Sequence, residues 1–236
     1  MFNAVFGVQA GKEITSGGSN TLMGTYVGLS LTTGGYHVLI GTQAGQKLTT
    51  SNFNTHVGYR ASRYNTGAYN ISIGTQALLG VDGSSTGGSN LAIGYNSTDA
   101  LTTGIYNVGL GNETLTNLTT GQKNTALGYI SLQHIRTATD SVGVGYFAGR
   151  YASGSYNTFV GSEAGRGGTT SAPYSSGIRN TAVGYGALTA FTTVDDIVAI
   201  GHKAAAAITT GARNTAIGFQ AMLEHTTGAN NIAIGN

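Results

Sequence analysis

A large apolar residue followed by glycine recurs at a nearly constant interval along all 236 residues of this chain. The recurring glycines are Gly7, Gly24, Gly41, Gly58, Gly74, Gly94, Gly111, Gly128, Gly145, Gly161, Gly184, Gly201, Gly218 and Gly235. Nine of the thirteen steps between them are 17 residues long, and the other four are 16, 20, 16 and 23. A fixed period of this size is typical of repeat proteins, whose units bury their apolar surface only by stacking on one another. The period therefore predicts about fourteen stacked repeats.

Each repeat opens with five residues that alternate in size, in the order Asn, variable, small, large apolar and Gly. The pattern is cleanest at Asn214–Gly218 and Asn124–Gly128. Alternation is a strand signal, the glycine permits a bend, and a Thr-Thr-Gly segment later in the repeat has the composition of a turn. Frequent glycine and β-branched residues disfavour the alternative, a pair of short helices in each repeat. The fold class that we predict is all-β, a parallel β-solenoid with 17-residue coils.

The alternation also predicts which residues face the interior of a coil. The second and fourth positions are on one face of the strand, and the fourth is always large and apolar. We expect that face to fill the core. The opposite face, with Asn and the small residue, would then be free for close approach between chains, and its asparagines could form ladders of hydrogen bonds.

The step lengths repeat as well, because three steps of 17 residues are followed each time by one of 16 and then a long one. We interpret residues 1–236 as a single solenoid with a five-coil super-repeat, covering about residues 8–94 and 95–184, with a partial copy at 185–236. The two long steps contain insertions, around residues 81–89 and 166–179. Insertions in solenoids form loops on one side, which is often the binding side.

Aromatic and charged residues in the short coils and the insertions are the candidate receptor contacts. They are Arg63, Tyr64, Tyr69, Arg150, Tyr151, Tyr156, Asp82, Arg166, Tyr174 and Arg179. Tyrosine and arginine suit contact with a sugar or a protein through stacking and hydrogen bonding. The alternative is structural, namely that the tyrosine rings cover a coil junction where the shorter step leaves a gap.

Several function classes are disfavoured by composition. The net charge of +2 offers no basic surface for nucleic acid. The sequence also contains no run of 18 apolar residues, so it does not predict membrane insertion. The chain has no cysteine, its five histidines occupy different repeat positions, and its acidic residues are scattered. We therefore expect no metal site, no cofactor, no catalytic residues and no enzyme activity.

The Asn-Thr-Ala-Ile-Gly-x-x-Ala motif, as in Asn214–Ala221, and its variant at Asn180–Ala187 resemble the head repeats of trimeric autotransporter adhesins. With the Thr-Thr-Gly turn, the motif is still more similar to the repeat regions of phage tail fibres. The resemblance implies a left-handed β-roll type of coil and a homotrimer packed about a common axis. It also implies a place in the virion, as a stiff structural rod of a tail fibre for recognition of, and attachment to, a glycan or protein of the host surface.

Other functions remain open at this stage. A bacterial surface adhesin head, extracellular or on the bacterial cell surface, is the main alternative. An ice-binding solenoid is less favoured, because the threonines form adjacent pairs at a turn instead of an outward Thr-x-Thr strand. A polysaccharide depolymerase would need acidic residues that converge in a groove. No polar capping segment is visible at either end, so we expect other fibre or tail proteins to be partners there, besides further copies of the chain.

Overall fold

Short parallel β-strands, one in each coil, are the regular secondary structure of residues 2–236, which the computed structural model describes. The chain forms two compact units, of which the first ends at Gly121 and the second runs from Gln122 to Asn236. The strands of the first unit are β1 (Ala4–Phe6), β2 (Thr21–Met23), β3 (Val38–Ile40), β4 (Thr55–Val57), β5 (Ile71–Ile73), β6 (Leu91–Ile93) and β7 (Val108–Leu110). Those of the second are β8 (Thr125–Leu127), β9 (Val142–Val144), β10 (Thr158–Val160), β11 (Thr181–Val183), β12 (Val198–Ile200), β13 (Thr215–Ile217) and β14 (Ile232–Ile234).

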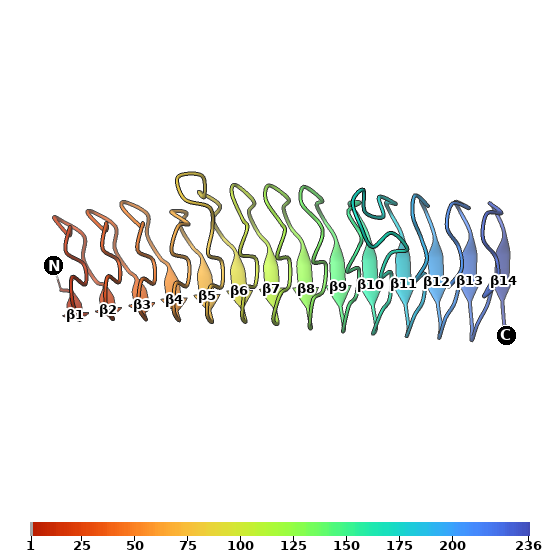
Figure 1. Cartoon of the computed structure of the whole chain (residues 1–236), viewed down its shortest axis with the longest axis horizontal. Coiled ribbons are helices and arrows are strands. Elements are labelled where there is room, and N and C mark those ends of the chain that lie inside the picture. The colour runs from red at the N-terminus through yellow and green to blue at the C-terminus, as the bar shows by residue number, and fades with distance from the viewer. Residues whose placement is uncertain (1) are drawn as a thin grey trace. The chain divides into compact units, whose positions relative to one another are not determined.

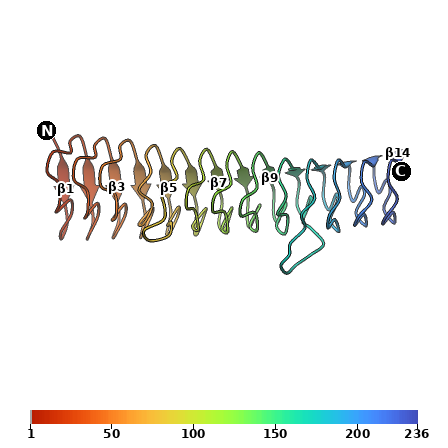
Figure 2. The same ribbon diagram turned by 90° about the horizontal axis from the view of Figure 1, so that it is seen from above.

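Within each unit, every strand pairs in parallel with the strand of the next coil, and the register follows the sequence repeat. Val38 pairs with Thr55 between β3 and β4, for example, and Val198 pairs with Thr215 between β12 and β13. Figure 1 shows these strands side by side, with the turns of successive coils in parallel rows. Turned by 90°, Figure 2 shows that the connection between β10 and β11 projects beyond the neighbouring turns of its unit. The predicted parallel β-solenoid with 17-residue coils is thus confirmed.

The prediction of which residues face the core was wrong. The central residue of most strands is fully buried, whether it is large, as in Leu39, or small, as in Ala92. The flanking residues point outwards, so that Ile71 and Ile73 on β5 are 41% and 39% exposed. The asparagine before the strand, such as Asn54, is buried as well. Asparagine and the small residue therefore fill the coil, and the second and fourth positions form its outer surface.

Hydrogen bonding explains why asparagine points inwards. The side-chain oxygen of Asn90 accepts the backbone N–H of Asn107 at 2.9 Å, and its side-chain nitrogen donates to the carbonyl of Gly104 at 3.0 Å. The same two bonds recur at Asn157 and Asn180 in the second unit. Buried backbone groups need partners, and here the asparagine of most coils joins the amide just before the next strand to a turn carbonyl. The predicted ladder of asparagines exists, but it is inside the solenoid.

The narrow interior is filled by residues of complementary size. The side chain of Leu39, at the centre of β3, fills the space beside Gly45. If Gly45 had a Cβ, that atom would lie 3.0 Å from Cδ1 of Leu39. The order is reversed in the second unit, where Gly143 is at the strand centre and its added Cβ would lie 2.7 Å from Cγ of Leu132. One large side chain thus occupies the space that its neighbour leaves free, which keeps the core close-packed.

The fourth position of each coil forms an exposed row that we call the apolar column. Its members are Phe6, Met23, Ile40, Val57, Ile73, Ile93 and Leu110 in the first unit, and Leu127, Val144, Val160, Val183, Ile200, Ile217 and Ile234 in the second. All of them are at least partly exposed. Contiguous apolar surface of this kind, repeated over seven coils, is typical of a surface that another polypeptide covers.

Candidate functional site

The first insertion is a short loop that is anchored to the coils on both sides. Its turn is closed by a hydrogen bond of 3.0 Å from the Ser84 amide to the Val81 carbonyl. Ser85 is 2% exposed, and its hydroxyl accepts the Val81 amide and donates to the carbonyl of Leu101 in the next coil, both at 2.6 Å. The Thr66 amide of the preceding coil donates to the Ser85 carbonyl at 2.8 Å, so the loop is fixed between the coils of β4 and β6.

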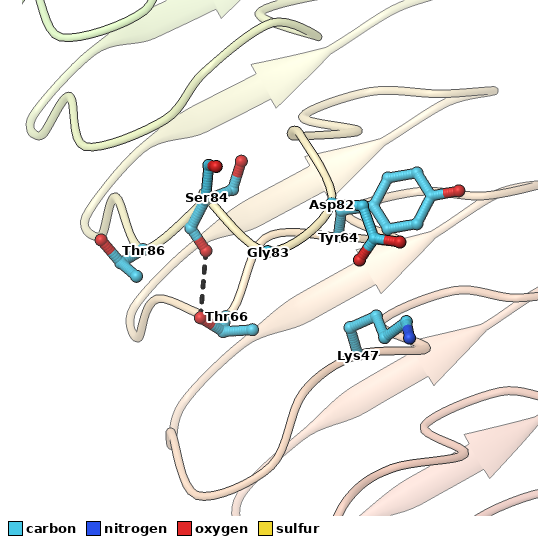
Figure 3. A pocket seen from close by; sticks show the side chains of 8 residues that line it. Lys47, Tyr64, Thr66, Asp82, Gly83, Ser84 and Thr86 are labelled. Atoms are coloured by element: carbon cyan, nitrogen blue, oxygen red, sulfur yellow. Dashed lines mark hydrogen bonds between the residues drawn. The ribbon is translucent and has the colours of Figure 1, made fainter.

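A cavity of about 190 Å³ lies between this loop and the two preceding coils. It is lined by Lys47, Tyr64, Thr66, Asp82, Gly83, Ser84, Ser85 and Thr86. The Thr66 hydroxyl closes one side by donating to the Ser85 carbonyl at 3.0 Å. In Figure 3 the Asp82 carboxylate lies beside the Tyr64 ring and points towards Lys47. The hollow thus combines one aromatic ring with a cation, a carboxylate and hydroxyl groups.

Arg63 holds the tyrosine of this hollow in place. Its guanidinium carbon lies 4.7 Å from the centre of the Tyr64 ring, and its Nε donates to the Gln46 side chain at 2.7 Å. A cation over the face of a ring is attracted by the ring's quadrupole. The ring is therefore oriented by a side chain that is itself fixed by the preceding coil.

The second insertion lies over the equivalent coil of the second unit. Ser175 forms a β-bridge with Ala152, and its amide donates to the Tyr151 carbonyl at 3.0 Å. This pairing brings the Tyr174 ring onto His134, with 4.1 Å between ring centres, while His134 also stacks on Tyr151 at 5.5 Å. Two tyrosines from distant parts of the chain are thus joined through one histidine.

The arginine arrangement is repeated here. The Arg150 guanidinium carbon lies 4.8 Å from the centre of the Tyr151 ring and 4.4 Å from that of Phe147, and its Nε donates to Gln133 at 3.3 Å. Arg150 and Gln133 are each 87 residues after their counterparts in the first unit. We call Lys47, Arg63, Tyr64 and Asp82 the first aromatic patch, and His134, Arg150, Tyr151 and Tyr174 the second.

His134 is electrically neutral at neutral pH in this environment. Burial lowers its pKa, and the positive charge of Arg150 lowers it further. A neutral imidazole stacks on tyrosine without placing a second cation beside the arginine. The second patch consequently has one cation, whereas Lys47 and Arg63 give the first patch two.

Four of the sequence-predicted contacts lie outside both patches. Tyr69 and Tyr156 each precede the asparagine of their coil, and Tyr69 stacks on Phe53 at 5.2 Å instead. Arg166 pairs with Glu163 at 3.1 Å, and Arg179 pairs with Asp196 at 2.6 Å and with Asp195 at 3.8 Å. Of the ten candidates, the structure therefore brings Arg63, Tyr64 and Asp82 together in one unit and Arg150, Tyr151 and Tyr174 in the other.

Lys47 and His134 are members of the patches that were not among the predicted contacts. They are 87 residues apart, the same interval that separates Arg63 from Arg150, so the super-repeat contained the signal. Each lies one coil before the tyrosine of its patch. Stacked coils bring residues 17 apart into contact, so a residue one coil before the insertion can belong to the same site.

In the part of the chain that the structure describes, residues 2–236, no three side chains among His, Asp and Glu lie close enough together to hold a metal ion. Nor does this part contain a helix of the length and apolar character needed to cross a membrane. The two aromatic patches are thus the best-supported candidate sites.

Comparison with protein-family models, with curated proteins and with solved structures finds no match for this chain.

Proposed function

We propose that this chain is a structural segment of a phage tail fibre that contacts the host receptor through its two aromatic patches. The observation that carries the proposal is the duplicated arrangement itself. In each unit an insertion meets a tyrosine that is oriented by an arginine and preceded, one coil earlier, by Lys47 or His134. Core packing alone does not require a protruding loop at the same place in both copies. The resemblance of the repeats to phage fibre repeats supports a location in the virion.

The residues of the patches suit recognition of a surface glycan or a protein loop. A tyrosine ring offers an apolar face to a sugar or a side chain, and arginine, lysine, aspartate and hydroxyl groups at its edge offer directional hydrogen bonds. The first patch is the more polar, because its hollow includes Lys47, Asp82 and Thr66. Two weak contacts in each chain, multiplied by several chains, would bind tightly through avidity.

We further propose that the chain associates with copies of itself along the apolar column, as a homotrimer of left-handed coils. The column presents one apolar side chain every coil, at the strand spacing of about 4.8 Å. A partner that packs against all of these side chains in register needs the same spacing, which a second copy has. The number of chains and the handedness are supported by the resemblance of the repeats to trimeric adhesins and phage fibres.

The virion location can be tested with an antibody raised against the purified chain. Phage particles that carry the gene should be labelled on their tail fibres in electron micrographs, and their purified particles should contain the chain by mass spectrometry. Particles without the chain, with label on the bacterial surface instead, would contradict the phage proposal and favour a surface adhesin.

The receptor role can be tested by measuring adsorption of the labelled chain to host cells. Replacing Tyr64 and Tyr151 together by alanine should lower adsorption at least tenfold, because each loss weakens a contact that avidity multiplies. Tyr95 is 47% exposed and outside both patches, so Tyr95→Ala is the matched control. Equal adsorption of the double variant and the unaltered chain would argue against the patches as receptor contacts.

A further inference from the structure

The residue before the first position of each coil, which is asparagine in most coils and His37 in one, forms a second row on the surface of the first unit, which we call the ring column. Its members include Tyr36, Phe53, Tyr69, Ser89 and Tyr106. All five have nearly the same left-handed backbone conformation, with φ between 57° and 61°. Their Cα–Cβ bonds therefore leave the coil in the same direction, and their side chains lie above one another.

Three of these rings form a continuous stack. Tyr36 and Phe53 are 4.9 Å apart between ring centres with 13° between their planes, and Phe53 and Tyr69 are 5.2 Å apart with 15°. Phe53 thus lies between two tyrosines, one coil away on each side. The fold itself shows which group this spacing accepts, namely a planar aromatic ring.

The stack is interrupted at Ser89. The register pairs Ile71 with Leu91 and Leu91 with Val108, which places Ser89 directly between Tyr69 and Tyr106. Two strand spacings separate these tyrosines, or about 9.6 Å. A ring inserted between them would lie about 5 Å from each, which is the distance found in the intact stack and typical of aromatic pairs.

A hollow of about 450 Å³ occupies this place. Its lining includes the two exposed tyrosines, Ser89 and an aliphatic wall from the outward strand positions, and the wall residues are Ile71, Leu91 and Val108. No residue of the lining carries a charge. We call this hollow the ring slot. Its shape and apolar wall suit an uncharged flat group better than a sugar, whose hydroxyl groups would find few partners there.

We propose that the ring slot binds one planar aromatic side chain of a partner polypeptide, which takes the place in the stack that Phe53 occupies between Tyr36 and Tyr69. The slot is separate from both aromatic patches, and its proposed role does not depend on them. Ser89 creates the slot, because it is a small residue between two tyrosines of the row. Tyr69 and Tyr106 supply the two faces, and the aliphatic wall excludes water from the edge of the bound ring.

The proposal can be tested with small probes that carry the same ring. N-acetyl-tryptophanamide and p-cresol should bind in saturation-transfer NMR with affinities in about the millimolar range expected for so few atoms. One site is expected in a chain that carries Ser19→Tyr, which fills the similar gap between Phe2 and Tyr36. Methyl α-glucopyranoside is the comparison probe. Tyr106→Leu should weaken binding of the aromatic probes by about 2- to 10-fold, the value of one aromatic pair.

Two further variants make the test specific. Ser19 lies in the same row between Phe2 and Tyr36 and leaves a similar gap, so all variants are made in a chain that already carries Ser19→Tyr. In that chain Ser89→Tyr should complete the stack and abolish probe binding, whereas Asp140→Tyr, at the equivalent position of a coil in the second unit, should leave it unchanged. Phe53→Ser in the same Ser19→Tyr chain should create a further slot between Tyr36 and Tyr69 and raise the number of sites from one to two. Probe binding that survives Ser89→Tyr, absence of aromatic binding, or tighter binding of the glucoside would each overturn the proposal.

Discussion

The side-chain oxygen of Asn54 accepts a hydrogen bond of 2.8 Å from the backbone N–H of Asn70, which lies in the next coil. The side-chain nitrogen of Asn54 also donates to the carbonyl of Gly67 at 3.0 Å. Asn54→Ala would leave both backbone groups buried without these partners, at about 1–3 kcal/mol each. We predict that this variant loses about 2–6 kcal/mol in the free energy of unfolding, measured by urea denaturation.

Asn112→Ala is the matched control for the ladder. Asn112 also accepts a backbone amide of a neighbouring coil, from Tyr95 at 2.9 Å, but at a site that water reaches. Water can replace the lost bond there, so the loss should stay within about 1 kcal/mol. Equal losses in the free energy of unfolding for the two variants would show that the buried asparagine bonds stabilise the fold no more than an exposed one.

Acid should destabilise the first unit through two buried histidines. Burial and the neighbouring His37 lower the pKa of His56 to about 3, and burial lowers the pKa of His37 as well. Below about pH 6.5 the unfolded chain takes up protons that the folded chain does not. Stability is therefore complete above pH 6.5 and decreases as the pH falls towards 3, by on the order of 4–5 kcal/mol for His56.

The histidine effect can be isolated by replacement with residues that the repeat uses elsewhere. His37→Asn restores the ladder residue, and His56→Ala restores a common strand centre. Asp99 acts in the opposite sense, since burial and the charge of Glu113 raise its pKa to about 6, so that acid stabilises its folded form. The histidine variant and the reference chain with both histidines should therefore both carry Asp99→Asn. An unchanged loss of stability between pH 7 and pH 4 in the His37→Asn, His56→Ala chain would refute the assignment.

The glycine after each strand is required by space as well as by conformation. Gly41 has a φ of 124°, and a Cβ there would lie 2.5 Å from the carbonyl oxygen of Gly58 in the next coil. Because the obstacle is backbone, it cannot move aside without separating the coils. We predict that Gly41→Ala prevents folding of the first unit or lowers its unfolding temperature by more than about 10 °C, as measured by circular dichroism.

Gly83, in the first insertion, provides the comparison. Its φ of 74° is also left-handed, but a Cβ there would meet no atom within 4 Å. Gly83→Ala should therefore cost only the conformational strain, about 1 kcal/mol. A similar drop in melting temperature for both variants would show that conformation, and not coil spacing, fixes the glycine period.

A charged residue in the apolar column should be harmless to assembly only if no other chain covers the column. Ile73 is 39% exposed on β5, so lysine in its place can reach water in an isolated chain. If copies pack on this face, Ile73→Lys buries a charge at each contact and should dissociate the assembly. Thr75→Lys, just past the bend, is the control. Size-exclusion chromatography should show an altered assembly for Ile73→Lys alone.

The sequence predicted the coils but not which residues fill their interior. The glycine period predicted where each strand ends, and the strands end at the residue just before those glycines. The large residues, such as Ile71 and Ile73, were expected inside because burial usually follows size and hydrophobicity. That rule fails here because the interior is narrow and Asn70 must point into it to satisfy the turn carbonyl of Gly87 at 2.9 Å. An asparagine at the same place in most coils was the available signal.

The patches could be predicted only in part, for a related reason. The duplicated Arg-Tyr pair identified Arg63, Tyr64, Arg150 and Tyr151 because both copies keep these residues. The path of an insertion depends on its anchors, and Ser85 and Ser175 have no distinctive pattern in the sequence. The meeting of Tyr174 with His134 therefore becomes visible only in three dimensions.

The most direct test of the account is the mass of the purified chain in solution, measured by light scattering. Self-association through the apolar column as a homotrimer predicts three chains of 23.9 kDa, or about 72 kDa. A stable mass of 23.9 kDa at micromolar concentration would contradict it, because the apolar column would then face water in every coil.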